Sequence, residues 1–110
     1  MKSEFVFGTV GAHLSTPKKP GGSVGAIQRI AALELGAFEL GWVQSVRVTA
    51  DTCAAIRAAH SETGVQSSVH APYFINLNAN EEEWPKSRKR LMDAAHYGCL
   101  AGATDIIFHP

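Results

Sequence analysis

The 110-residue sequence lacks most of the features that mark membrane or secreted proteins. No apolar run is long enough to span a bilayer, and the first residues do not lead into the apolar stretch of a signal peptide, so we expect no membrane partner. Only two cysteines occur, Cys53 and Cys99, and their spacing matches no metal-ligand pattern. We expect both to be reduced core thiols of a cytoplasmic protein.

The sequence also lacks an excess of charge and the glycine patterns of nucleotide-binding folds. Ten basic and ten acidic residues give a formal net charge of zero, so the bulk charge does not indicate a partner. No Gly-x-Gly-x-x-Gly motif follows the first apolar run, and the glycine-rich segment 21–25 has no phosphate-binding lysine. These absences make a nucleotide-binding doubly wound sheet the less favoured alternative.

What the sequence does contain is an alternation of short apolar runs and longer segments with helical spacing. We expect the first run to form a strand that is buried on both faces. The expected strands cover residues 5–10, 37–42, 65–69 and 104–108. The expected helices begin at Ser23, at Thr49 or Asp51, and around Pro85, and they end at Gly36, at Gly64 and near Gly102.

A strand and a helix that repeat about every 30 residues are typical of parallel β-α-β units. A TIM barrel needs eight such units, and this chain supplies about half of them. The predicted fold class is therefore α/β: a portion of a TIM (β/α)8 barrel, with about its first four strands and three helices. We expect residues 1–110 to be the N-terminal part of one such domain, in a chain that is truncated.

Three histidines follow expected strands, at the barrel edge that carries the chemistry in this fold. His13, His70 and His109 follow the first, third and fourth strands. Imidazoles at neighbouring strand ends can bind one zinc ion at about 2.0–2.1 Å. His70 and His109 are therefore candidate zinc ligands, with hydrogen-bonded histidines that close the strand ends as the alternative. For His13 a hydrogen bond within its loop is favoured.

Two histidines do not complete a zinc site. The carboxylates on expected strands near this edge are Glu39 and Asp105. The two remaining histidines, His60 and His96, fall inside expected helices, where surface exposure or packing between helices is the favoured interpretation.

Four short motifs stand out in the sequence: Gly-Ala-His-Leu-Ser at 11–15, His-Ala-Pro-Tyr-Phe-Ile-Asn-Leu at 70–77, Lys-Ser-Arg at 86–88 and Phe-His-Pro at 108–110. They resemble the N-terminal part of the endonuclease IV family of apurinic/apyrimidinic endonucleases, which belongs to the xylose-isomerase-like barrels. The segment 41–48, after the second strand, differs from the best-known bacterial form of that family and is closer to an archaeal-like branch.

The resemblance implies a zinc-dependent DNA repair enzyme that holds three zinc ions and hydrolyses the phosphodiester on the 5′ side of abasic sites in double-stranded DNA. It implies that His70 and His109 bind the same zinc ion. Tyr73 and Phe74 would form a wedge that fills the gap left by a flipped abasic nucleotide, with packing on the barrel rim as the alternative. The resemblance also implies contacts of other residues with DNA, those of the two lysines and of Arg47 being with phosphates. These residues are His13, Lys18, Lys19 and Arg47.

In the family, the remaining metal ligands lie on strands five to eight, so this segment alone is expected to be inactive. We expect the complete barrel to be a monomer, and we expect that the unpaired edges of a half barrel can self-associate. Two alternatives remain open: a sugar isomerase or epimerase of the same barrel group, and an inactive truncated fragment.

Overall fold

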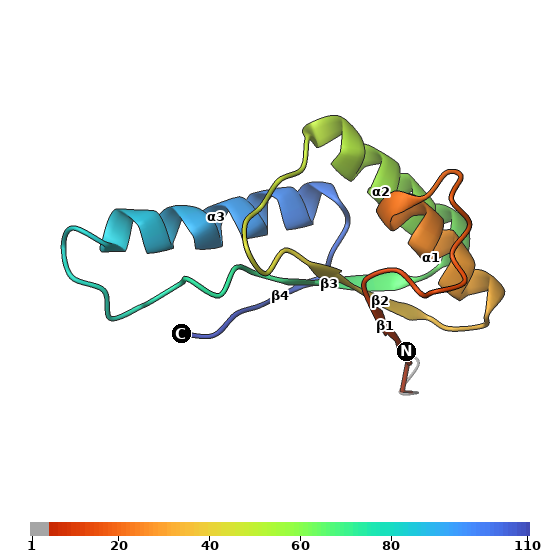
Figure 1. Ribbon diagram of the computed structural model, residues 1–110, viewed down its shortest axis with the longest axis horizontal. Coiled ribbons are helices and arrows are strands. Elements are labelled where there is room, and N and C mark those ends of the chain that lie inside the picture. Colours follow the sequence, from red (N-terminus) through yellow and green to blue (C-terminus); the bar gives the residue numbers. More distant parts are fainter. Residues whose placement is uncertain (1–4) are drawn as a thin grey trace.

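The computed structural model describes residues 5–110 as a four-stranded parallel sheet with three helices packed on one face (Figure 1). The strands pair in sequence order, as successive β-α-β units require. The strands are β1 (Gly8–Val10), β2 (Ala37–Gly41), β3 (Gln66–His70) and β4 (Asp105–Ile107). The helices are α1 (Gly22–Ala32), α2 (Ala50–Thr63) and α3 (Trp84–Leu100). The predicted fold class, a partial parallel barrel, agrees with this arrangement.

The two faces of the sheet differ in polarity because successive residues of a strand point to opposite faces. Phe38, Leu40 and Val69 are buried against the helices. On the other face, Glu39 and Ser68 are directly opposite each other in the register and are only half-buried. In a closed barrel this second face is the interior. The core residues contributed by the helices are Ala26, Ile27, Ile30, Cys53, Ile56, Ala59 and Ala94.

Helix α1 differs from the prediction at both ends. The expected cap, Ser23, lies inside a helix that begins one residue earlier, and the expected stop, Gly36, lies beyond its end. The chain leaves α1 through Glu34, which has a left-handed φ of 63°. The amide of Leu35 then donates to the carbonyl of Ile30 at 2.9 Å. This bond satisfies a carbonyl at the helix end, which lets a residue other than glycine occupy the turn.

The other two helices begin where the sequence indicates. Thr49 caps α2, with its hydroxyl accepting from the amide of Thr52 at 3.1 Å, and Gly64 ends that helix with φ 76°. Pro85 lies in the first turn of α3, where a missing amide proton does no harm. Among the described residues, no helix has both the length and the apolar character needed to cross a membrane.

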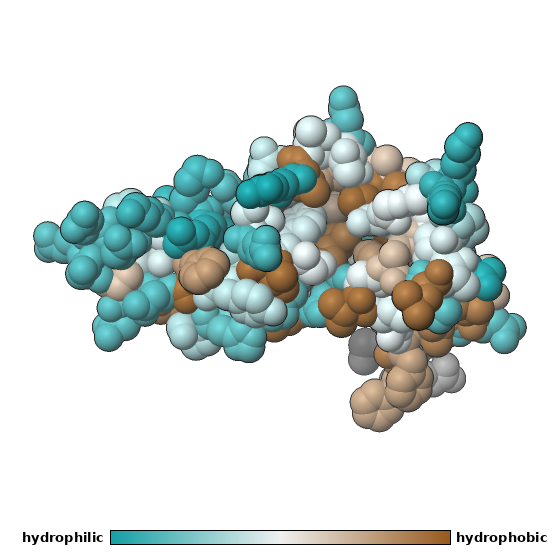
Figure 2. All heavy atoms as spheres, viewed as in Figure 1, coloured by the Kyte–Doolittle hydropathy of each residue, from teal (hydrophilic) through white to brown (hydrophobic). Residues whose placement is uncertain are grey.

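Strand β1 contradicts the expectation of a strand buried on both faces. It has three residues and lies at an edge of the sheet. Phe5 is 92% exposed and Phe7 is 73% exposed, because nothing in residues 5–110 covers this edge or the adjoining inner face. Figure 2 shows hydrophobic side chains projecting at this end of the molecule.

The two thiols differ in burial, so the prediction of two core cysteines is half wrong. Cys53 is fully buried between the helices and the sheet, whereas Cys99 is exposed. The reason lies in the orientation of α3, which turns Ala94 and Gly98 toward the sheet. Residue 99 is about 100° further around the helix than residue 98 and therefore faces solvent. Both thiols are free.

Candidate functional site

His70 and His109 meet at the carboxyl edge of the sheet. His70 is the last residue of β3, and its register partner on β4, Ile107, lies two residues before His109. The Nε2 atoms of the two imidazoles are 3.3 Å apart, and the ring centroids are 5.2 Å apart. Adjacent parallel strands thus bring together two side chains that are 39 positions apart in the sequence.

The hydrogen bonding of His70 leaves one ring nitrogen available for a metal ion. Its Nδ1 is 2.8 Å from the carbonyl oxygen of Ala71. A carbonyl can only accept, so Nδ1 carries the proton and Nε2 keeps its lone pair. This is the usual arrangement of a metal-binding histidine, in which the other nitrogen donates to a carbonyl or carboxylate.

The distance between the two Nε2 atoms fits a shared ion. Two nitrogen ligands at zinc distances and tetrahedral angles lie about 3.3–3.4 Å apart. The observed 3.3 Å between His70 and His109 matches this value. The same distance also suits a hydrogen bond from Nε2–H of His109 to Nε2 of His70, so both alternatives expected from the sequence agree with the geometry.

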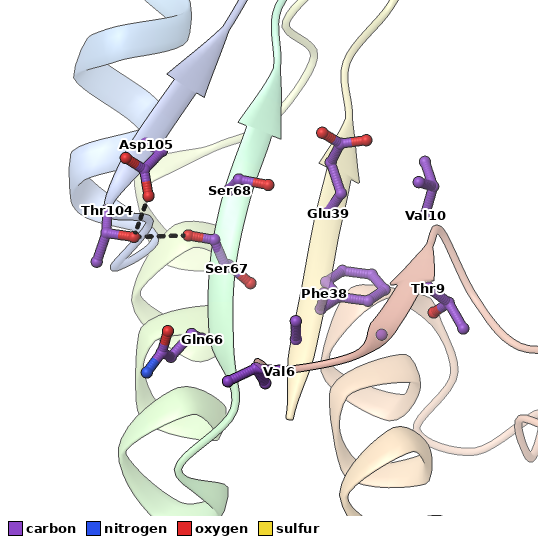
Figure 3. A pocket seen from close by; sticks show the side chains of 12 residues that line it. Val6, Thr9, Val10, Phe38, Glu39, Gln66, Ser67, Ser68, Thr104 and Asp105 are labelled. Atoms are coloured by element: carbon purple, nitrogen blue, oxygen red, sulfur yellow. Dashed lines mark hydrogen bonds between the residues drawn. The ribbon is translucent and has the colours of Figure 1, made fainter. Parts of the chain in front are cut away.

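The remaining ligands of such a site are not assembled in the described part of the chain. Within residues 5–110, no group of three or more His, Cys, Asp or Glu side chains is arranged to hold a metal ion. Glu39 and Asp105 lie on the inner face of the sheet, where each is the register partner of Ser68 on β3. Ser68 precedes His70 by two residues, so both carboxylates lie further from the carboxyl edge than His70 does. They line a cavity of about 400 Å³, which is shown in Figure 3. His70 and His109 therefore form a partial ligand set.

The segment that follows His70 exposes two aromatic side chains between buried anchors. Ala71, Pro72 and Ile75 are buried, with relative exposures of at most 3%. Tyr73 and Phe74, which lie between these anchors, are 55% and 65% exposed. Within residues 5–110, the two rings do not pack on the rim, and both side chains remain open to solvent.

Tyr73 joins the histidine pair to the neighbouring loop. Its ring centroid is 5.6 Å from that of His70 and 6.3 Å from that of His109. Its amide donates to the carbonyl of Val43, in the loop after β2, at 2.9 Å. Tyr73 of the candidate wedge and the two candidate ligands thus form one cluster.

The predicted DNA-contacting residues His13 and Arg47 lie apart from this cluster. The ring of His13 bonds Ser15 in its own loop, with Nδ1 2.8 Å from Oγ, as the sequence favoured. Arg47 donates from Nε to the hydroxyl of Ser45 at 2.8 Å. Both are exposed, and within residues 5–110 neither forms a hydrogen bond or ring contact with His70 or His109. Lys18 and Lys19 are exposed as well.

A hollow of about 560 Å³ lies between the first loop and the cluster. Its lining includes Gly11 and Ala12 from the loop after β1, Val43 from the loop after β2, and Tyr73. The three loops at the carboxyl edge therefore border a common depression, as the active-site loops of a barrel do.

One of the two helical histidines, His96, is exposed, and the other, His60, packs against a neighbouring segment; these are the two interpretations that the sequence favours for them. His96 makes an edge contact with Tyr97 at a centroid distance of 4.9 Å. His60 lies against Gly102, and its two ring nitrogens are buried without a hydrogen-bond partner in the described residues. Burial lowers the pKa of His60, because the charged imidazolium loses its hydration.

Sequence reasoning missed two residues of α3 that form hydrogen bonds with the backbone of the segment after β3. Arg90 donates to the carbonyl of Phe74 at 2.8 Å, and the hydroxyl of Ser87 accepts from the amide of Asn76 at 3.1 Å. Ser87 lies in the Lys-Ser-Arg motif, which the sequence singled out without assigning a role. Arg90 could have been found only from its position three residues after Ser87, which places it on the same face of the helix.

Comparison with known proteins finds two relatives that this chain matches over most of its own length. The chain is 31% identical over 106 residues to endonuclease 4 of Thermus thermophilus, covering 91% of this chain and 39% of that protein. It is 33% identical over 106 residues to an uncharacterised protein of Methanocaldococcus jannaschii, covering 96% of this chain and 36% of that protein. The chain thus spans less than half the length of these relatives.

The fold gives the same result. The crystal structure of endonuclease IV from Thermus thermophilus superposes with a TM-score of 0.69 at 31% identity, covering 92% of this chain and 39% of the other. No family model matches the sequence. The resemblance to the N-terminal part of endonuclease IV, predicted from the motifs, is confirmed in both sequence and fold.

Proposed function

We propose that this segment supplies His70 and His109 to a zinc-dependent endonuclease that hydrolyses the phosphodiester on the 5′ side of abasic sites in double-stranded DNA. The observation that carries the proposal is the nitrogen pair at 3.3 Å beside the exposed ring of Tyr73, which the exposed Phe74 follows in the chain. The similarity to endonuclease IV in sequence and fold supports a nuclease-type enzyme. Because the chain covers 39% of that relative, the activity is proposed for a complete barrel.

In this proposal, Nε2 of His70 and Nε2 of His109 hold one of three zinc ions. Zinc, when bound, supplies an activated water molecule and neutralises charge on the phosphate. The protein's own contribution at this position is to fix the direction of the lone pairs on the two Nε2 atoms. The bond from Nδ1 of His70 to the carbonyl of Ala71 fixes one of them.

Tyr73 and Phe74 are proposed to recognise the lesion. An abasic nucleotide has lost its pairing and stacking, so it leaves the duplex at little energetic cost, and apolar side chains can fill the gap that it leaves. Both side chains are more than half exposed, and the ring of Tyr73 lies next to the histidine pair. Selectivity for damage follows without any reading of base sequence.

The exposed cations and His13 are proposed to contact the flanking DNA. Lys18 and Lys19 lie in the loop after β1, and Arg47 lies in the loop after β2. Such contacts with the DNA backbone contribute affinity that weakens with salt. We further propose a cytoplasmic protein that is monomeric as a complete barrel, with unpaired edges of β1 and β4 through which the segment alone can self-associate.

A nicking assay tests this proposal. Duplex DNA with one abasic-site analogue is incubated with this chain and with a form extended to the length of a complete barrel, each with zinc and with a chelator. We expect the extended form to cut 5′ to the lesion, and we expect His109→Ala and chelation to abolish the cut. Uncut DNA with zinc-loaded extended protein would contradict the proposal.

A sugar isomerase or epimerase of the same barrel group is the second candidate. The polar inner face favours it, because Glu39, Ser68 and Asp105 line a cavity of about 400 Å³, a volume suited to a small polar substrate. The exposed aromatic pair has no role in such an enzyme. Metal-dependent exchange of a carbon-bound proton on a small polyol or ketose would support this candidate, and its absence from a protein that nicks abasic DNA would exclude it.

A further inference from the structure

The segment between β3 and α3 is attached to the first half of α3 through two side chains of one helix face. We infer that Ser87 and Arg90 are positioning residues, which together form a latch that fixes Tyr73 and Phe74 for insertion into DNA. The part of this inference that concerns DNA rests on the proposed function. The latch itself rests on contacts within the protein.

Arg90 contacts Phe74 in two ways. Its Nη1 donates to the carbonyl of Phe74 at 2.8 Å, and its guanidinium carbon is 5.9 Å from the centroid of the Phe74 ring. The first contact fixes the backbone, and the second is within the range of a cation–π interaction. Both leave the ring 65% exposed, so Arg90 orients Phe74 without burying it.

Ser87 provides the second attachment point. It is 3% exposed, and its hydroxyl accepts from the amide of Asn76 at 3.1 Å. Ser87 and Arg90 are three residues apart and therefore lie on the same face of α3. Ile75, which is buried, lies between the two attachment points, so the backbone is held at residues 74, 75 and 76.

Fixing the backbone in advance matters for a wedge. A mobile loop would lose conformational entropy on entering the duplex, and this loss would weaken the discrimination between damaged and intact DNA. A latched loop has already lost that freedom on folding. We therefore expect the latch to increase the preference for abasic DNA and to leave general DNA affinity nearly unchanged.

Helix α3 offers a matched control for the charge of Arg90. Arg88 is exposed and forms no hydrogen bond or ion pair within residues 5–110, and it lies two positions from Arg90, on a different face of the helix. Arg88→Met therefore removes the same charge as Arg90→Met without touching the latch.

Two measurements test the inference. Amide hydrogen exchange reports on the loop, and we expect the Asn76 amide to exchange about tenfold faster in Ser87→Ala, because it loses its acceptor. The second measurement is the preference ratio, which is the affinity for an abasic-analogue duplex divided by the affinity for an intact duplex. We expect this ratio to fall about fivefold in Arg90→Met, the size expected for the loss of one hydrogen bond, and to hold in Arg88→Met.

A double substitution tests whether Arg90 acts through the wedge. In a Phe74→Ala background, Arg90→Met should have no further effect on the preference ratio. A persisting effect would mean that Arg90 touches DNA itself, and an equal loss in Arg88→Met would mean that only charge matters; either result would overturn the inference.

Unchanged amide exchange in both latch variants would overturn the latch alone. A wild-type protein that binds both duplexes equally would overturn the proposed function and the DNA role of the latch, but the exchange data would still show whether the latch holds the loop.

Discussion

The two halves of the sheet's carboxyl edge differ in how they arrange their polar side chains. At the ends of β3 and β4, His70, Tyr73 and His109 form one cluster with ring centroids 5.2–6.3 Å apart. At the ends of β1 and β2, His13 and Arg47 each bond a serine of their own loop. The difference teaches that a position after a strand does not by itself bring a histidine to another candidate ligand. What distinguishes His70 and His109 is that their Nε2 atoms face each other across two adjacent strands, 3.3 Å apart.

Substitution of either histidine of the pair should distinguish the two halves of the edge most strongly, through its effect on zinc affinity. We expect His70→Ala or His109→Ala to weaken zinc binding about 100-fold or more, since loss of a mere supporting hydrogen bond weakens metal sites about 10–100-fold. His13→Ala should leave zinc affinity unchanged. A zinc titration against a chromogenic chelator measures all three. Equal losses from His13→Ala and His109→Ala would remove the distinction between the two halves.

The exposed aromatic side chains come next. Tyr73→Ala and Phe74→Ala should each lower the preference for abasic over intact duplex about tenfold, because each stacked contact contributes about 1–3 kcal/mol. Neither change should greatly alter the free energy of unfolding, since both side chains are more than half exposed. Ile75→Ala, at a buried position, should instead lower it by about 2–5 kcal/mol.

Binding isotherms and chemical denaturation separate these effects. If Phe74→Ala destabilised the fold as much as Ile75→Ala, the ring would be part of the core and the wedge interpretation would fail.

Arg47 in the other half of the edge should have a smaller and less specific effect. We expect Arg47→Ala to weaken binding a few-fold for abasic and intact duplexes alike, and to reduce the slope of log affinity against log salt by about one. Binding measured at several salt concentrations tests this expectation. A loss confined to abasic DNA would mean that the two halves of the edge act together at the lesion.

Acidification should test the half-buried His60, whose two ring nitrogens have no hydrogen-bond partner in the described residues. Burial lowers the pKa of His60 in the folded state, so the unfolded chain binds the proton more readily. The stability contribution of neutral His60 is therefore fully present above the unfolded pKa of about 6.5 and is lost as the pH falls below it. Denaturation midpoints at pH 7.5 and pH 5 should show a modest loss, which should be smaller in His60→Gln. An identical loss in this variant would point to other groups.

Much of the cluster could be predicted from the sequence because it depends on local rules. Short apolar runs that alternate with capped helices define parallel strands, and residues after neighbouring parallel strands meet at one edge. These rules bring His70 close to His109, whereas the exposure of Tyr73 and Phe74 is expected only from the family resemblance.

The errors arose where packing between elements or the geometry of a turn decides the outcome. The sequence of β1 is apolar, yet its burial depends on neighbours that residues 5–110 do not supply. Cys99 is exposed because of how α3 is rotated, and one residue of rotation changes the face. Glu34 ends α1 through hydrogen bonds that no propensity scale contains. Arg90 reaches Phe74 across 16 positions, a contact that only the packed structure shows.

The most direct test of the central claim is a histidine ¹⁵N NMR spectrum recorded during zinc titration. The proposed function predicts that zinc shifts the Nε2 resonances of His70 and His109 together. It also predicts that Nδ1 of His70 stays protonated and that the ring resonances of His13 do not move. Zinc that leaves both Nε2 resonances unchanged, or that shifts His13 instead, would contradict the claim that these two strand ends share a metal ion.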